Sequence, residues 1–179
     1  MLNPESTIPG ASHVVGDFWS WAYSDILSNT NRGVFAEFLV GAALRIIDQP
    51  RIEWDAVDFR YQGRGIEVKS VAYLQSWKQT KPSIVAFDIA PKKGWDSTTN
   101  VSATESLRSA DIYVFCLFAE QDPTLANVLD TQQWDFYVVP AETFNTDYPT
   151  QKKISLDPLR RIASAVSYAD LKQNVDSFI

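Results

Sequence analysis

The chain has 179 residues, of which 45% are hydrophobic and 13% are aromatic, and its formal net charge is −6. This length and apolar content suit one folded domain with a sizeable core and exclude a disordered chain. The acidic balance excludes a global attraction to nucleic acid or anionic lipid, so a nucleic-acid partner requires a local basic patch or metal ions.

Cysteine usage and hydropathy indicate where the protein works. Cys116 is the only cysteine, which leaves neither a disulfide framework nor a cysteine-based zinc site. The N-terminus has no basic segment followed by an apolar run, so we expect no signal peptide. No apolar stretch approaches the ~20 residues that a membrane-spanning helix needs. We therefore expect a cytoplasmic protein that does not enter a membrane.

The first fifty residues predict an arm followed by two helices. Residues 1–15 contain prolines and a glycine without a clear period, and we interpret them as an N-terminal arm of a single domain spanning 1–179. Asp17 is a suitable N-cap for a helix over 18–27. A second helix, over about 32–47, has apolar residues at helical spacing.

Glu37 lies in this second helix, four residues from Gly33 on one side and from Gly41 on the other. Side chains four residues apart share a helix face, so this strip would let another backbone come close and would direct the carboxylate into the contact. A solvated helix glutamate is the alternative, and the strip alone does not decide between them.

The stretch 58–69 predicts a β-hairpin that turns at Gln62-Gly63, because a two-residue loop ending in glycine suits a tight primed turn. This turn pairs Asp58 with Glu67 across the two strands, and directly opposed side chains lie on the same face, roughly 5 Å apart at Cβ. Lys69 is two residues beyond Glu67 and therefore lies on that face too. We expect two carboxylates and one ammonium group on one side of the hairpin and a core on the other.

The rest of the chain predicts further strands and a closing helix. Residues 83–90, 112–118 and 134–139 are nearly continuous in apolar residues, as is typical of buried strands. Residues 91–100 are polar, with proline and glycine, and predict a loop. A helix is expected over 168–175. The fold class is therefore α/β.

Asp58, Glu67 and Lys69 are the side chains expected for metal-assisted hydrolysis of a phosphodiester. Two adjacent carboxylates raise each other's pKa unless a cation lies between them, and Mg²⁺ is held by one or two carboxylates together with water and phosphate oxygens. A lysine beside the metal can steady the attacking hydroxide or the charge that grows on the phosphoryl group. Glu37 could add a ligand or orient a bound water.

Two alternatives stay open. Lys69 could form only a cross-strand salt bridge with the acids in an unrelated α/β fold. Asp55 is a rival for Asp58, although it lies three residues earlier and has the opposite strand parity.

The order Glu37, Asp58, Glu67-Val68-Lys69 and then Gln75 resembles the restriction-endonuclease-like PD-(D/E)xK nuclease superfamily. The run 67–77 also looks like a bacterial group within it. The resemblance implies a restriction-endonuclease-like core with a central mixed β-sheet flanked by helices. It implies that Asp58 and Glu67 bind the metal, that Lys69 is catalytic, and that Glu37 and Gln75 match further site positions.

The sequence departs from the superfamily pattern at two positions. Val57 precedes Asp58 where the pattern has proline, and Gln79 stands where the exonuclease-type signature has tyrosine. The second departure weighs against an end-dependent exonuclease more than against nuclease activity.

We therefore expect a Mg²⁺- or Mn²⁺-dependent nuclease, a hydrolase that acts on nucleic acid, most simply DNA. The alternative is a catalytically inactive nuclease-fold module for binding or assembly. A homodimer is expected by analogy with enzymes that cut both strands. The local candidates for phosphate contact are Arg60, Arg64, Lys92, Lys93 and Trp95.

Overall fold

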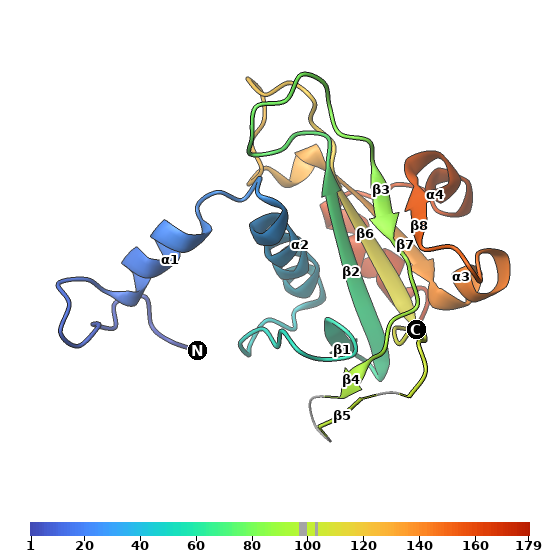
Figure 1. The fold of residues 1–179 in the computed structure, drawn as a ribbon, viewed down its shortest axis with the longest axis horizontal. Coiled ribbons are helices and arrows are strands. Elements are labelled where there is room, and N and C mark those ends of the chain that lie inside the picture. The colour runs from blue at the N-terminus through green and yellow to red at the C-terminus, as the bar shows by residue number, and fades with distance from the viewer. Residues whose placement is uncertain (97–99, 103) are drawn as a thin grey trace.

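The computed structural model describes residues 1–96, 100–102 and 104–179. An isolated bridge joins Thr7 to Val14, and helix α1 follows at Val15–Tyr23. No residue of α1 is buried, and Figure 1 shows α1 on the side of the next helix that faces away from the sheet. The assignment of 1–179 to a single domain with an arm stays a prediction.

The start predicted for the first helix is wrong. Asp17 is not the N-cap but lies in the first turn, and its carboxylate accepts the N–H of Val14 at 3.0 Å. The helix also ends earlier than expected, because Asn31 binds the carbonyls of Ala22 and Asp25 at 3.3 and 3.0 Å and holds the chain in a turn there.

Helix α2 spans Asn29–Leu44, with Ser28 as its N-cap and a left-handed residue, Arg45, at its end. This helix packs closely on the hairpin at Gly41, where an added Cβ would lie 3.0 Å from the Phe59 ring and 2.7 Å from Ile47. An added Cβ at Gly33 would meet nothing within 4 Å. Of the two glycines that flank Glu37, therefore, only Gly41 lies at a close contact with another element.

The predicted hairpin register is confirmed for the three pairs next to the turn, whereas the expected pair of Asp58 with Glu67 lies beyond the observed ladder. Strand β1 (Phe59–Tyr61) pairs antiparallel with β2 (Arg64–Ala72), and Tyr61 faces Arg64. Gln62 and Gly63 have φ values of 49° and 81°, the left-handed conformations that a primed turn requires. Asp58 directly precedes β1.

The hairpin is one edge of a mixed sheet with strand order β1-β2-β6-β7. Strand β6 (Ile112–Phe118) runs parallel to β2, and β7 (Trp134–Pro140) runs antiparallel to β6 after the short 3-10 helix Thr131–Gln133. Every residue of β6 is buried. Both the α/β class and the central mixed sheet flanked by helices are thereby shown.

Each face of the sheet has its own core. Helices α2 and α5 (Tyr168–Asp176) cover one face, where Ile66 and Val68 are buried. The other face is covered by short elements (Figure 1), namely strands β3 (Ala86–Asp88) and β8 (Lys153–Ser155) and helices α3 (Ala141–Asp147) and α4 (Leu156–Ile162). The closing helix agrees with the prediction. No described helix is long and apolar enough to cross a membrane.

Two expected segments differ from the structure. The strand expected over 83–90 is formed only at Ala86–Asp88, where it pairs with the three residues of β8. The loop expected over 91–100 contains strand β4 (Trp95–Asp96), which pairs with β5 (Val101–Ser102). Residues 97–99 of that predicted loop lie outside the described residues.

Candidate active site

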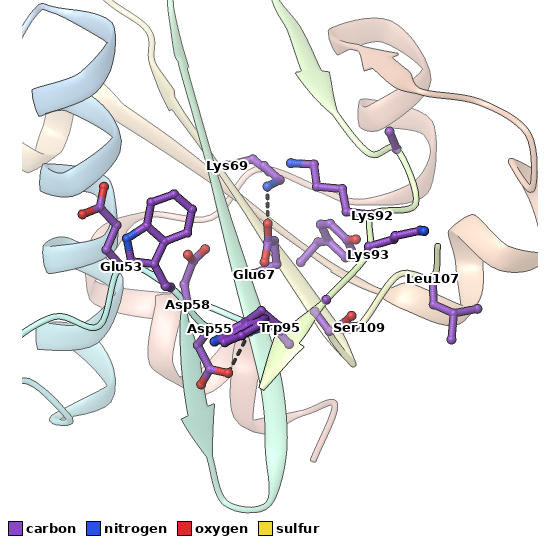
Figure 2. Close-up of a pocket in the computed structure, with 16 residues that line it drawn as sticks. Glu53, Asp55, Asp58, Glu67, Lys69, Lys92, Lys93, Trp95, Leu107 and Ser109 are labelled. Carbon is purple, nitrogen blue, oxygen red and sulfur yellow. Dashed lines mark hydrogen bonds and ion pairs between the residues drawn. The ribbon is translucent and has the colours of Figure 1, made fainter. Parts of the chain in front are cut away.

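Asp58, Glu67 and Lys69 lie together on the wall of a pocket of about 820 Å³ (Figure 2). The Val68 N–H donates a hydrogen bond of 2.7 Å to Asp58 Oδ2, which holds the Asp58 carboxylate against β2 beside Glu67. The three side chains therefore meet because Glu67 and Lys69 alternate along β2, and because Asp58, directly before β1, is hydrogen-bonded to β2 between them. Their chemical roles stay predictions.

The carboxyl group of Asp58 is strongly perturbed. Burial raises its pKa to about 7, and the charges of Glu67 and Glu37 add to the rise, while the Val68 N–H and Lys69 oppose it. The negative charge around Asp58 is thus not fully compensated by Lys69, which favours binding of a proton or a cation.

Lys69 forms an ion pair with Glu67. Alternate residues of β2 place both on the same face, and their side chains are only 17% and 19% exposed. The salt bridge that the sequence allows is therefore formed, but it lies inside the pocket rather than on a solvated surface.

Glu37 approaches Asp58 from the other side. Its helix covers the opposite face of the sheet, and its carboxylate is held by Arg51, with Nε 2.5 Å from Oε2 and Nη2 2.9 Å from Oε1. Glu37, Arg51 and Asp58 line a second, more apolar hollow of about 650 Å³. Asp58 therefore stands between two hollows, with Glu67 in one and Glu37 in the other.

The two remaining candidate site residues, Asp55 and Gln75, form hydrogen bonds with residues close to them in the chain. Asp55 lines the pocket but accepts from the Arg60 guanidinium at 3.2 Å and from the Ala56 N–H at 2.7 Å. Gln75 lies beyond the end of β2, where its amide donates to the Ala72 carbonyl at 3.1 Å. Gln75 is not among the described residues that line the pocket.

Tyr113 also lines the pocket and was not predicted from the sequence. It is buried on β6, directly across from Glu67 in the parallel pair. Burial raises the pKa of Tyr113 to about 12, and the charge of Glu67 adds to the rise, so the phenol stays protonated and can donate a hydrogen bond. An apolar run such as 112–118 offers no signal for this role.

The basic candidates separate by position. Arg60 is paired with Asp55, and Arg64 lies 3.4 Å from Asp111 at the hairpin turn. Lys92, Lys93 and Trp95 line the pocket. Their segment is fixed by a backbone bridge between Lys92 and Leu107, with two hydrogen bonds of 2.9 Å.

The donor set suits a hard divalent cation bound by two carboxylates. In the described part of the chain, no group of three or more His, Cys, Asp or Glu side chains is gathered so as to hold a metal ion. Asp58 and Glu67 match the one or two carboxylates that Mg²⁺ takes from a protein. Water and substrate oxygens would have to complete the coordination.

The model of the bacteriophage T4 endonuclease IV family matches residues 20–132, which is more than half of the chain. This match includes α2, the hairpin and β6, and therefore the carboxylates and the lysine of the pocket. No curated protein matches the chain.

Proposed function

The chain belongs to the bacteriophage T4 endonuclease IV family, and we propose that it is a metal-dependent nuclease that hydrolyses phosphodiester bonds in DNA. Family membership supports a nuclease that acts on DNA. The observation that carries the finer proposal is the pocket that brings Asp58, Glu67 and Lys69 together. We further propose that the chain is a member of the PD-(D/E)xK superfamily, because these three residues lie in the order and register that it uses.

In this proposal Asp58 and Glu67 hold Mg²⁺ or Mn²⁺. A bound divalent ion would supply charge neutralisation and would lower the pKa of a water bound to it. The raised pKa of Asp58 supports the assignment, since burial and the charges of Glu67 and Glu37 raise it and a bound cation would offset both effects.

Lys69 is proposed to be catalytic. Its ammonium group would leave Glu67 to donate to a non-bridging oxygen of the phosphate as negative charge grows there. The buried Tyr113 phenol stays protonated and can donate to the same region. As a bond forms between the water oxygen and phosphorus, the water releases a proton to solvent. The bond to the leaving oxygen breaks, and that oxygen takes a proton from solvent.

Glu37 and Gln75 are proposed to position the site. Glu37 adds negative charge next to Asp58 while Arg51 neutralises it from the other side. Gln75 donates to Ala72 and to Ser83 Oγ, the latter at 3.2 Å, and would fix the end of the strand that carries the catalytic residues.

A nicking assay tests the enzyme proposal. Plasmid and linear DNA are incubated with Mg²⁺ or Mn²⁺ and with wild type, Glu67→Ala, Lys69→Ala or Lys153→Ala. We expect each pocket variant to lose at least about 100-fold in rate. Lys153 is exposed on β8 and should have no effect. Equal trace activity in all four proteins would indicate contamination, and the proposal would then fail.

The second candidate is a catalytically inactive binding or assembly module. The Lys69–Glu67 ion pair favours it, because both groups already satisfy each other. Such a protein would bind DNA without cutting it, and Mn²⁺ would not raise its melting temperature.

We also propose that the protein acts as a homodimer. Helix α1 supports this, since it carries Phe18, Trp21 and Tyr23, which are 47%, 85% and 47% exposed. Exposed aromatic residues grouped on one short helix are typical of a contact surface. Light scattering should show that wild type is a dimer and that Trp21→Ser is a monomer. A monomeric wild type would refute the proposal.

A further inference from the structure

Lys92 is a second cation of the pocket, and its position is built by the fold. It follows β3, whose last residue, Asp88, lies 2.9 Å from Lys92 Nζ through Oδ2. Asp88 in turn accepts the N–H of Ala90 at 3.1 Å. The backbone of Lys92 is held on its other side by the bridge to Leu107. Both ends of this residue are therefore fixed, although its side chain stays 59% exposed and accessible to a ligand.

The direction of the side chain distinguishes Lys92 from its neighbour. In Figure 2 the ammonium group of Lys92 lies towards Lys69 on the upper side of the pocket, whereas Lys93 points outward. Burial alone would lower the pKa of Lys92, but the hydrogen bond with Asp88 and the charges of Asp88 and Glu67 raise it. Lys92 thus remains a full positive charge within electrostatic reach of Glu67.

The pocket accordingly has an acidic part and a basic part. Asp58 and Glu67 belong to the acidic part, and Lys69 and Lys92 lie beyond Glu67 in the basic part. A nucleic acid brings several backbone phosphates near the site. Only the phosphate that is cut lies at Asp58 and Glu67, so its neighbours need other partners. A lysine supplies the compact charge and rotatable donors that bind a further phosphate.

We propose that Lys92, positioned by Asp88, binds a backbone phosphate of the nucleic acid next to the phosphodiester that is cut at Asp58, Glu67 and Lys69. This inference rests on the proposed nuclease function and adds a phosphate subsite to it. Asp88 is a positioning residue in this arrangement, because it touches the lysine and not the phosphate.

The test compares Lys92→Met with Lys153→Met. Lys153 faces Asp88 in the β3–β8 pair but is not among the described residues that line the pocket. With Mg²⁺ and a mixed-sequence DNA oligonucleotide, Lys92→Met should raise KM about 5- to 30-fold, as expected for one lost charged contact, and change kcat little. Lys153→Met should change neither, and Lys92→Arg should restore most of the loss.

The salt dependence of binding provides a readout without turnover. In the Glu67→Gln background, adding Lys92→Met should reduce the slope of log K against log salt by about 0.9 on duplex or about 0.7 on single-stranded DNA. Asp88→Asn should weaken binding less and keep the slope. A purely structural Lys92–Asp88 pair would leave the slope unchanged and would alter only stability.

The outcomes separate the two proposals. If wild type cleaves DNA but Lys92→Met keeps the wild-type KM and salt slope, the subsite is refuted and the nuclease stands. The same holds if Lys153→Met behaves like Lys92→Met, because the effect would then be one of overall charge. If wild type neither binds nor cuts DNA with Mg²⁺ or Mn²⁺, both proposals fail.

Discussion

At the residue scale, Asp58 determines how the site responds to pH. Its pKa is about 7 in the folded protein and about 3.9 in an unfolded chain. The folded state therefore holds a proton that the unfolded state has already lost, and the stability that this proton contributes falls as pH rises from about 4 through 7.

Asp58→Asn should consequently stabilise the metal-free protein at pH 8, and should stabilise it by roughly a third as much at pH 5. Asparagine has no charge to repel Glu67 and can still accept from the Val68 N–H. The gain at pH 8 should reach at most about 4 kcal/mol. Urea unfolding in EDTA at both pH values measures it.

Asp88→Asn is the matched control, with the opposite sign. Burial alone would raise the pKa of Asp88, but the hydrogen bonds from Lys92 and from the Ala90 N–H, together with the charges of Lys92 and Lys69, lower it overall. Its stabilising contribution is thus present above the unfolded pKa, and the variant should be less stable than wild type at pH 8. If Asp58→Asn were instead less stable than wild type at pH 8, the ionised Asp58 carboxylate would not destabilise the folded protein.

At the element scale, Gly41 sets the distance between α2 and β1. Gly41→Ala would push a methyl group into Ile47 and Phe59, and we expect a loss of about 1–3 kcal/mol. Gly33→Ala on the same helix meets nothing within 4 Å and should gain about 0.5–1 kcal/mol from helix propensity. Thermal or urea unfolding decides between them, and equal effects at the two sites would contradict the close packing at Gly41.

The pair of Arg51 and Glu37 joins α2 to the segment before the hairpin. Arg51→Met would leave the Glu37 carboxylate buried without its partner, at 12% exposure. Because Arg51 is itself partly exposed, we expect a loss of about 1–3 kcal/mol.

A double variant, Glu37→Gln with Arg51→Met, should recover much of that loss, since no unpaired charge remains. Urea unfolding of the two single variants and the double variant forms a complete cycle. If the double variant were as unstable as Arg51→Met alone, the loss of stability would come from lost packing of Arg51 and not from the unpaired charge of Glu37.

At the scale of the whole molecule, the net charge is −6, so the divalent cation that we propose would add to stability and would reduce the repulsion of DNA. A metal that binds only the folded state at 100 times its Kd adds about 2.7 kcal/mol, which corresponds to a rise in Tm of about 5–10 °C for a chain of this size. Mn²⁺ should produce this shift in wild type and not in Glu67→Gln. An equal shift in both proteins would place the metal elsewhere.

The sequence by itself determined the hairpin and the buried strand β6. The two-residue turn at Gln62-Gly63 sets the pairing of its neighbours, because a tight loop leaves only one register. Side-chain alternation along β2 then places Glu67 and Lys69 on one face. The continuous apolar run over 112–118 identifies a strand that is covered on both sides. These features can be recognised in short stretches of sequence, because the turn, the alternation of side chains and the apolar run each show within a few residues.

Only the tertiary structure decided what surrounds that face. The packing of elements on opposite faces of the sheet allows Glu37 to form its ion pair with Arg51 and places Asp58 between two hollows. The pairing of β3 with β8, more than sixty residues apart, supports the Asp88 that holds Lys92. The burial of Tyr113 opposite Glu67 depends on the parallel pairing of β2 with β6. Such contacts join distant segments, so local patterns and turn preferences carry no signal for them.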